Sequence, residues 1–247
     1  MRNILLTVEY DGSRYHGFES QESSPIESTI SGRLREVIKK MTGQEDIELH
    51  TGFRTEIGVH AYAQTVNFKT ASDLSPEDMK HYMNKFLPMD IAIIDAKDVP
   101  ERFHSKLNAQ SKTFLFHMFI GREPNVFDRK HSSYSAQMIH KNLIREAAKA
   151  FVGIHDFKYF SNTKSNKSTI KEIYDINVYG DENGDEIFIT ISANDFLYNM
   201  VPIILGTMLD VGCGNRPIFD IPLIFAGKEK ASPPCDTKGL FLQQITY

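Results

Sequence analysis

GFRTEIGVHA, at residues 52–61, is the stretch from which the organisation of this chain can be read. An acid, Glu56, sits close to Arg54 in a short polar segment that contains Gly58 and leads directly into a strand-like run. A rigid strand after a tight turn is a suitable place to hold a charged group. A surface loop with a solvated acid has the same composition, so the residue types alone leave both interpretations open.

The segments on either side of this stretch predict a sheet with helices on one face. Thr29 opens a helix whose apolar side chains repeat at helical spacing up to Gly43, and Ser75 with Pro76 opens a second helix that runs to about residue 86. Strands are expected at residues 4–10, 47–49, 61–68 and 91–96. The first half therefore has the order β-α-β-β-α-β of a ferredoxin-like sheet.

A second α+β unit is predicted for the rest of the chain. Strands are expected around residues 114–118, 173–179 and 186–192, with a hairpin turn at residues 181–184. An amphipathic helix over residues 138–151 has Leu143 in its apolar stripe. Asn194 is expected to cap a last helix, which Pro202 should bend unless it lies in the first turn. We therefore predict two subdomains, residues 1–105 with the acid motif and residues 106–247.

Composition indicates an ordinary globular protein. The 247 residues are 41% hydrophobic, and no apolar run approaches the length of a membrane span. The start of the chain runs straight into a strand-like segment that is too short for a signal sequence, so we expect a cytoplasmic protein. Cys213 and Cys235 lack the spacing of a metal site or a disulfide framework, and no metal is expected.

Charge is unevenly distributed along the chain. The formal net charge is −4, yet residues 97–172 contain 14 lysines and arginines against 7 acids. A basic middle of this kind suits a phosphate-binding face, and it equally suits an ordinary solvated surface. The polar loop at residues 161–171, with Lys164, Lys167 and Lys171, leaves the same two interpretations open.

Motifs at six separated places resemble those of the TruA-type tRNA pseudouridine synthases. They are YDGSRYHGFESQ at residues 10–21, RTEIGVHA at 54–61, FHSK with AQSKTFLF at 103–116, GIHDFKYF at 153–160, NDFLYNMVPIILGT at 194–207, and PP with GLFL at 233–242. The resemblance covers essentially the whole chain. It implies the pseudouridine synthase fold, in which two ferredoxin-like halves with antiparallel or mixed sheets are joined across a central RNA-binding cleft. It also implies a homodimer that binds tRNA and isomerises uridine on the 3′ side of the anticodon stem-loop, with neither metal nor organic cofactor.

The resemblance also assigns roles to residues of the site. Glu56 stands where the family has its catalytic aspartate, and Arg54 would help to fill the gap left by the flipped base. Phe114 stands where a family tyrosine packs against the target base, although its residue pattern alone favours a core strand. Lys112 and His60 complete the expected substrate-binding residues.

Several of these positions depart from the family pattern. Phe18 and Glu19 replace a tryptophan and a glutamine, and Phe114 lacks the hydroxyl of the tyrosine. The extra methylene of Glu56 moves the carboxylate by roughly 1.5 Å, and Pro202 stands where the family has the arginine that pairs with the acid. Two hypotheses follow: an active synthase whose site is rebuilt around the longer acid, or a tRNA-binding homologue that does not catalyse the reaction.

Overall fold

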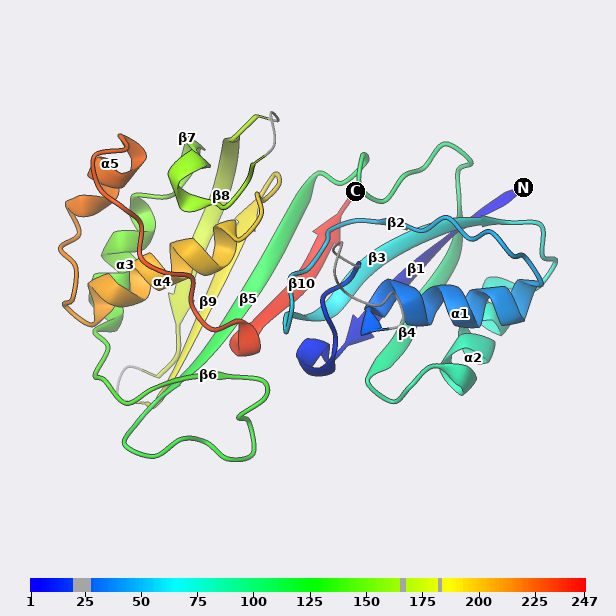
Figure 1. Ribbon diagram of the computed structural model, residues 1–247, viewed down its shortest axis with the longest axis horizontal. Coiled ribbons are helices and arrows are strands. Elements are labelled where there is room, and N and C mark those ends of the chain that lie inside the picture. The colour runs from blue at the N-terminus through cyan, green and yellow to red at the C-terminus, as the bar shows by residue number, and fades with distance from the viewer. Residues whose placement is uncertain (20–27, 165–167, 182–183) are drawn as a thin grey trace. The chain divides into compact units, whose positions relative to one another are not determined.

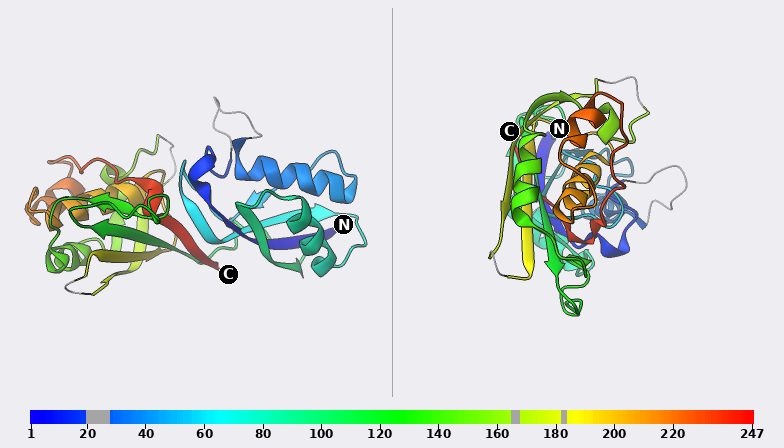
Figure 2. Two further views of the ribbon diagram at one scale, coloured as in Figure 1. Left: turned by 90° about the horizontal axis from the view of Figure 1, so that it is seen from below. Right: turned by 90° about the vertical axis from the view of Figure 1, so that its left-hand side faces the viewer.

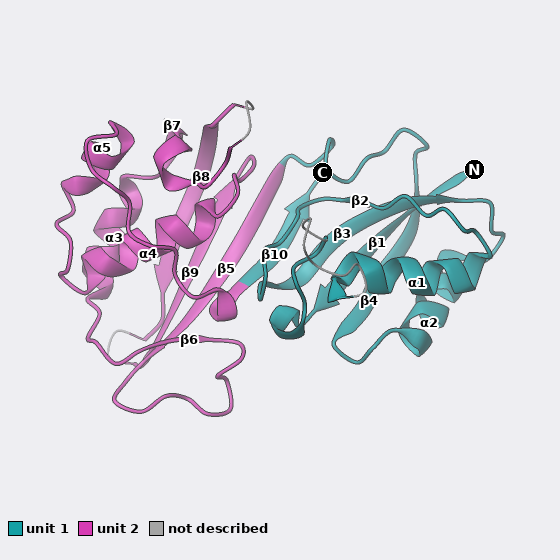
Figure 3. Cartoon of the chain, viewed as in Figure 1, with its two compact units in different colours: residues 1–110, 241–247 teal, residues 111–240 magenta. Residues whose placement is uncertain are grey.

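Strands rich in apolar and β-branched residues pair side by side in each of two units of the chain. The computed structural model describes residues 1–19, 28–164, 168–181 and 184–247, with unit 1 comprising residues 1–110 and 241–247 and unit 2 comprising residues 111–240 (Figure 3). Each unit carries helices as well as its sheet (Figure 1). The predicted α+β class is thus confirmed.

The sheet of unit 1 has the strand order β4-β1-β3-β10, and β2 also pairs with β3. Its strands are β1 (Arg2–Tyr10), β2 (His50–Thr51), β3 (His60–Thr70), β4 (Ile91–Val99) and β10 (Leu240–Thr246). β1 pairs antiparallel with both β3 and β4, and Leu6 lies opposite Val66. β10 runs parallel to β3 with Phe241 opposite His60, so the last strand of the chain adds to the unit that contains the acid motif.

Two helices of unit 1 begin where their capping residues predict. In α1 (Ile30–Thr42) the Thr29 side chain accepts a hydrogen bond from the Gly32 amide, and in α2 (Pro76–Phe86) the Ser75 side chain accepts from the Asp78 amide. These caps satisfy amides that have no partner within a helix. Both caps are confirmed, and Figure 2 shows α1 lying along the sheet.

The strand predicted at residues 47–49 is wrong in its position. Pairing with β3 begins only at His50, which lies opposite Asn67. Ile47 and Leu49 are buried. Their alternation therefore reflects burial of apolar side chains and not the hydrogen bonding of a strand.

The sheet of unit 2 has the order β6-β5-β9-β8-β7. Its strands are β5 (Ser111–Ile120), β6 (Ser133–Ser135), β7 (Gly153–Asp156), β8 (Ile170–Tyr179) and β9 (Glu186–Ala193). β6 is parallel to β5, and the other neighbours are antiparallel. Phe114, Phe116, Ile189 and Ile191 are buried on one face, as a period of two requires. The turn predicted at residues 181–184 lies partly outside the described residues. Lys167 lies wholly outside them.

The helices of unit 2 are α3 (Lys141–Lys149), α4 (Met200–Gly212) and α5 (Asp220–Phe225). α3 is shorter than predicted, and it buries Ile144, Ala147 and Ala148 while Leu143 is exposed. The buried face follows from close packing on α4, because a Cβ atom at Gly212 would lie only 2.7 Å from the Ile144 side chain. No described helix is long and apolar enough to cross a membrane.

The start of α4 corrects the expected role of Asn194. The helix begins at Met200, and the N-cap position is held by Asn199 in a left-handed conformation with φ 59°. The Asn194 side chain instead accepts hydrogen bonds from the Glu172 amide at 3.1 Å and the Asp195 amide at 2.7 Å. Pro202 therefore lies in the first turn of α4, where a missing N–H removes no helical hydrogen bond and no bend is required.

Candidate functional site

Gln64 fastens the acid loop, which we define as residues 52–59, to strand β3. Its side chain is fully buried. The Oε1 atom accepts from the amides of Phe53 at 3.3 Å and Thr65 at 3.1 Å, and Nε2 donates to the Phe53 carbonyl at 2.7 Å. A buried amide whose donors and acceptor are all engaged holds one orientation. The backbone immediately before Arg54 is thus fixed from within the sheet.

Tyr10 fixes the acid loop from the end of β1. Its hydroxyl lies 2.8 Å from the Thr55 hydroxyl, and Gln64 Nε2 donates to the same oxygen at 3.4 Å. Burial raises the pKa of Tyr10 to about 12; hydrogen bonds with Thr55 and Gln64 oppose the rise, and the negative charge of Glu56 adds to it. Tyr10 therefore remains neutral at physiological pH, beside the acid.

The loop before α1 packs directly on the backbone of the acid loop. The Phe18 amide donates to the Thr55 carbonyl at 3.1 Å. Gly17 has φ +84°, and a Cβ atom there would lie 2.9 Å from the same carbonyl oxygen, so this approach requires glycine. The Ser31 amide donates to the Phe18 carbonyl at 2.8 Å, which ties the loop to α1 as well.

The two charged residues of the acid loop differ in exposure. The Arg54 side chain is 67% exposed, and its Nε atom lies 2.6 Å from Oε2 of Glu19, whose side chain is 18% exposed. Glu56 is partly buried. The turn that contains it closes with a hydrogen bond from the Val59 amide to the Glu56 carbonyl at 3.3 Å. This arrangement presents a guanidinium and a carboxylate on one short, rigid turn.

His60 lies at the start of β3, behind the surface of unit 1. Its side chain is 2% exposed, and Nδ1 lies 3.1 Å from the Gly12 amide nitrogen and 3.2 Å from Oδ1 of Asp11. The ring stacks on Phe241 of β10 at a centroid distance of 4.7 Å. His60 thus ties the end of β1 to β3 and β10 within the sheet.

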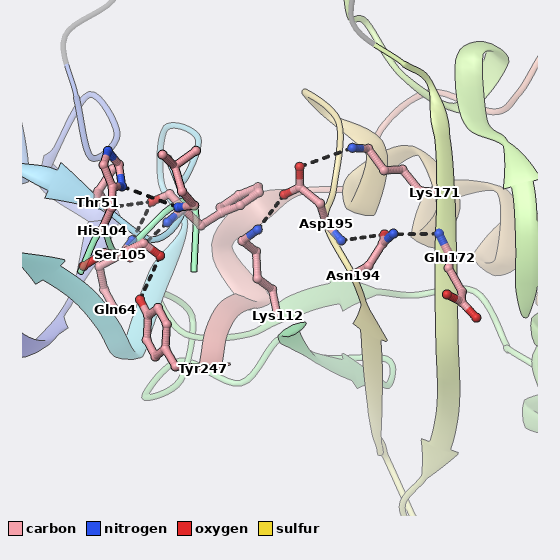
Figure 4. Close-up of polar contacts among 12 residues, drawn as sticks. Thr51, Gln64, His104, Ser105, Lys112, Lys171, Glu172, Asn194, Asp195 and Tyr247 are labelled. Atoms are coloured by element: carbon pink, nitrogen blue, oxygen red, sulfur yellow. Dashed lines mark hydrogen bonds and ion pairs between the residues drawn. The ribbon is translucent and has the colours of Figure 1, made fainter. Parts of the chain in front are cut away.

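Lys112 of β5 belongs to a partly buried charge cluster in unit 2 (Figure 4). Its side chain is 4% exposed and its Nζ atom lies 2.6 Å from Oδ1 of Asp195, while Nζ of Lys171 lies 3.2 Å from Oδ2 of the same carboxylate. Burial alone would raise the pKa of Asp195, but the charges and hydrogen bonds of the two ammonium groups outweigh it and hold that pKa below its usual range. Lys171 is therefore part of β8 and of this cluster, and not of a cationic loop.

Phe114 and Pro202 are both buried in unit 2. Phe114 is 1% exposed and packs edge to face on Phe196 at a centroid distance of 5.4 Å. This packing agrees with the core-strand alternative for Phe114. The Pro202 carbonyl accepts a hydrogen bond from the Cys235 amide at 2.9 Å, so the start of α4 is joined to the segment that follows α5.

The structure thus gathers the predicted residues into two groups. Arg54, Glu56 and His60 lie in unit 1 on the acid loop and the strand that follows it, and Lys112 and Phe114 lie in unit 2 on β5. Sequence reasoning missed the residues that hold them. Gln64 lies in the middle of the strand that follows the acid loop, and an amide side chain at such a position is a weak signal of this role, because buried amides are hydrogen-bonded.

Comparison with known proteins gives a consistent result. The family described as tRNA pseudouridine synthase matches residues 6–108 and 147–247. The chain is 36% identical over 250 residues to "tRNA pseudouridine synthase A 2" of a Bacillus cereus strain and 39% identical over 250 residues to "tRNA pseudouridine synthase A" of Caldicellulosiruptor bescii, with 100% of each chain covered. Among solved structures, an archaeal box H/ACA sRNP Nop10-Cbf5 complex is similar at 13% identity and a TM-score of 0.36, covering 74% of this chain and 40% of that one. The latter score is too low to support an inference.

Proposed function

Because the chain belongs to the tRNA pseudouridine synthase family, we propose that it isomerises uridine to pseudouridine in tRNA with Glu56 as the reacting carboxylate. The observation that carries the assignment to Glu56 is the fixed backbone around it. Thr55 is held through its side chain by Tyr10 and through its carbonyl by Phe18. A reacting group needs this fixity, because a displacement of about 1 Å can cost around 100-fold in rate.

The reaction explains why an acid is required at this position. The uracil base must detach from ribose C1′, rotate and bond again through C5 without leaving the site. A carboxylate can attack C1′, or it can take a proton from C2′ to give a glycal intermediate, and either route needs the acid in its ionised form. The exposed Arg54 would occupy the space that the flipped base leaves in the RNA.

The other predicted residues have supporting roles in this proposal. Lys112 and His60 are buried and engaged with other side chains, so we propose that each stabilises the strands of its own unit and does not contact RNA directly. Stacking of Phe114 on a base requires that its buried ring becomes accessible when RNA binds. Neither the family chemistry nor these residues call for a metal or an organic cofactor.

We further propose that the target uridines lie on the 3′ side of the anticodon stem-loop, and that the protein acts as a cytoplasmic homodimer. The motifs shared with the TruA-type synthases support both statements. Pseudouridine mapping identifies the modified positions directly. Light scattering distinguishes one chain of 28.2 kDa from two.

The decisive experiment replaces the acid and maps pseudouridine on unmodified tRNA. Glu56→Gln keeps the size of the side chain and removes its charge, so we expect product formation to fall by about 100-fold or more while tRNA affinity changes little. The matched control is Glu45→Gln, because this side chain of unit 1 is 94% exposed and its carboxylate lies 3.8 Å from the Lys39 ammonium group and not on the acid loop. Equal product from Glu56→Gln and the unaltered protein would reject the proposal.

Glu56→Asp separates the two hypotheses for this chain. If the site is rebuilt around the longer acid, shortening it should lower the rate, because the carboxylate would then fall short of the ribose. Product from the aspartate variant alone would instead identify a lapsed enzyme. Salt-sensitive tRNA binding without product from either protein would favour the non-catalytic homologue.

A further inference from the structure

Glu19, which forms an ion pair with Arg54, stands at a position where the chain departs from the family pattern. Glu19 stands where the resemblance predicts glutamine, and its carboxylate lies 2.6 Å from the Arg54 guanidinium. Within the described residues, Glu19 is the one acid paired with Arg54. The pair joins the residue assigned to base flipping with a charge that the family pattern does not include.

Glu19 is attached to a backbone that has little freedom. The preceding residue, Phe18, donates its amide hydrogen to Thr55 and accepts from Ser31 through its carbonyl, so it is bonded to the acid loop and to α1 at once. Its ring is fully buried. A carboxylate on such a backbone can hold a long, flexible side chain in one place, which keeps the Arg54 guanidinium in the geometry that base flipping requires.

The exposures of the two side chains suit this role. Glu19 is mostly covered whereas Arg54 is mostly exposed, so the carboxylate contacts one part of the guanidinium and most of the arginine remains available to solvent. The five N–H donors of arginine allow it to keep one partner while binding another. The same carboxylate places a negative charge beside the RNA phosphates, which weakens RNA binding.

We infer that Glu19 is a positioning residue for Arg54, which fixes the guanidinium for base flipping at a cost in RNA affinity. The inference rests on the proposed function of Arg54. It predicts an unusual result, because the loss of the Glu19 charge should lower kcat and at the same time raise the affinity for tRNA. A side chain with a purely structural role would not change these two quantities in opposite directions.

The test is Glu19→Gln, which restores the family side chain with nearly the same shape. We expect unmodified tRNA to bind about 2- to 5-fold more tightly at low salt, which corresponds to the energy of a single exposed charge pair. We expect kcat to fall by about 10-fold, because a neutral amide holds the Arg54 guanidinium less firmly than a carboxylate does. Glu19→Asp, which keeps the charge, should retain a larger part of the turnover than Glu19→Gln.

Two controls identify the source of the effect. Glu36→Gln removes an acid paired with Arg33 on α1 at 3.5 Å, so it changes the charge of unit 1 equally and should leave kcat as it is. In an Arg54→Ala background, Glu19→Gln should no longer lower kcat, because the two residues act as a pair. Unchanged melting temperatures would confirm that each variant is folded.

The outcomes separate this inference from the proposed function. Unchanged or increased kcat in Glu19→Gln, beside an active unaltered protein, would overturn the inference alone. Absence of product from the unaltered protein would reject the proposed function, and tRNA affinity would then decide the inference. The tighter tRNA binding of Glu19→Gln should persist in the Arg54→Ala background, because it follows from the charge of Glu19 alone. The loss of kcat should disappear there, and a loss of equal size in both backgrounds would reject the pairing.

Discussion

Tyr10 shows how a single hydroxyl group can fix the backbone beside the acid that we propose to react. The residue ends an apolar strand, yet its hydroxyl bonds Thr55, the neighbour of Glu56. Tyr10→Phe keeps the ring and removes this bond, so we expect the free energy of unfolding to fall by about 1 kcal/mol. Urea titration measures this change, and pseudouridine mapping should show a lower kcat. An unchanged kcat would mean that the other contacts of the acid loop are sufficient.

The raised pKa of Tyr10 adds a pH dependence to the same variant. The pKa is about 12 in the folded protein against 10.0 for the free side chain, because burial favours the neutral form. Stability from this group is therefore complete below pH 10 and is lost as the pH rises towards 12. The unaltered protein should lose more stability than Tyr10→Phe over this range, as measured by urea titration at successive pH values. Parallel losses would contradict the assignment, since other tyrosines are present in both proteins.

Asp195 connects strands β5 and β8 at the point where β9 ends. Asp195→Asn leaves Lys112, which is almost wholly buried, without its anionic partner, and we expect a loss of about 2 kcal/mol because the site is partly open to solvent. The pKa of Asp195 is lowered in the folded protein, so its contribution is present above the unfolded pKa and is lost as the pH falls through the folded pKa. Thermal unfolding should therefore be less acid-sensitive in the variant.

The double variant Lys112→Met with Asp195→Leu should recover stability, and its failure to do so would show that the cluster does more than neutralise Lys112.

Elements defined by local interactions were predictable from the sequence, and those defined by distant ones were not. The caps at Thr29 and Ser75 were predicted correctly because each bonds an amide only three residues away. The start of α4 was missed because the Asn194 side chain is engaged by the Glu172 amide in β8, 22 residues earlier. At the site, the resemblance predicts Glu56 as the reacting acid, and this stays a prediction. It did not identify Gln64 as its support, because that role depends on how β3 meets the acid loop.

The path of the chain through its two units has a consequence for folding. Unit 1 contains residues that precede unit 2 in the sequence and residues that follow it, because β10 comes after unit 2 and pairs with β3. Leu242 and Ile245 of β10 are buried. The Tyr247 hydroxyl, one residue beyond β10, bonds the Ser105 carbonyl at 3.0 Å and the Thr65 side chain. The sheet that carries the acid loop is therefore completed by residues that follow unit 2 in the sequence.

A chain truncated after Leu240 should accordingly lose stability in unit 1 first. Phe241, Leu242 and Ile245 are buried and contribute about 2 kcal/mol each, so amide protection in β1 and β3 should fall by about 10,000-fold while that of β8 and β9 changes little. Hydrogen exchange resolved by residue measures both regions in one experiment. Tyr247→Phe is the matched control, because it removes only a hydroxyl and should reduce protection by about tenfold at most. Equal losses in both units would mean that they unfold together, and unchanged protection in β3 would mean that its sheet is stable without β10.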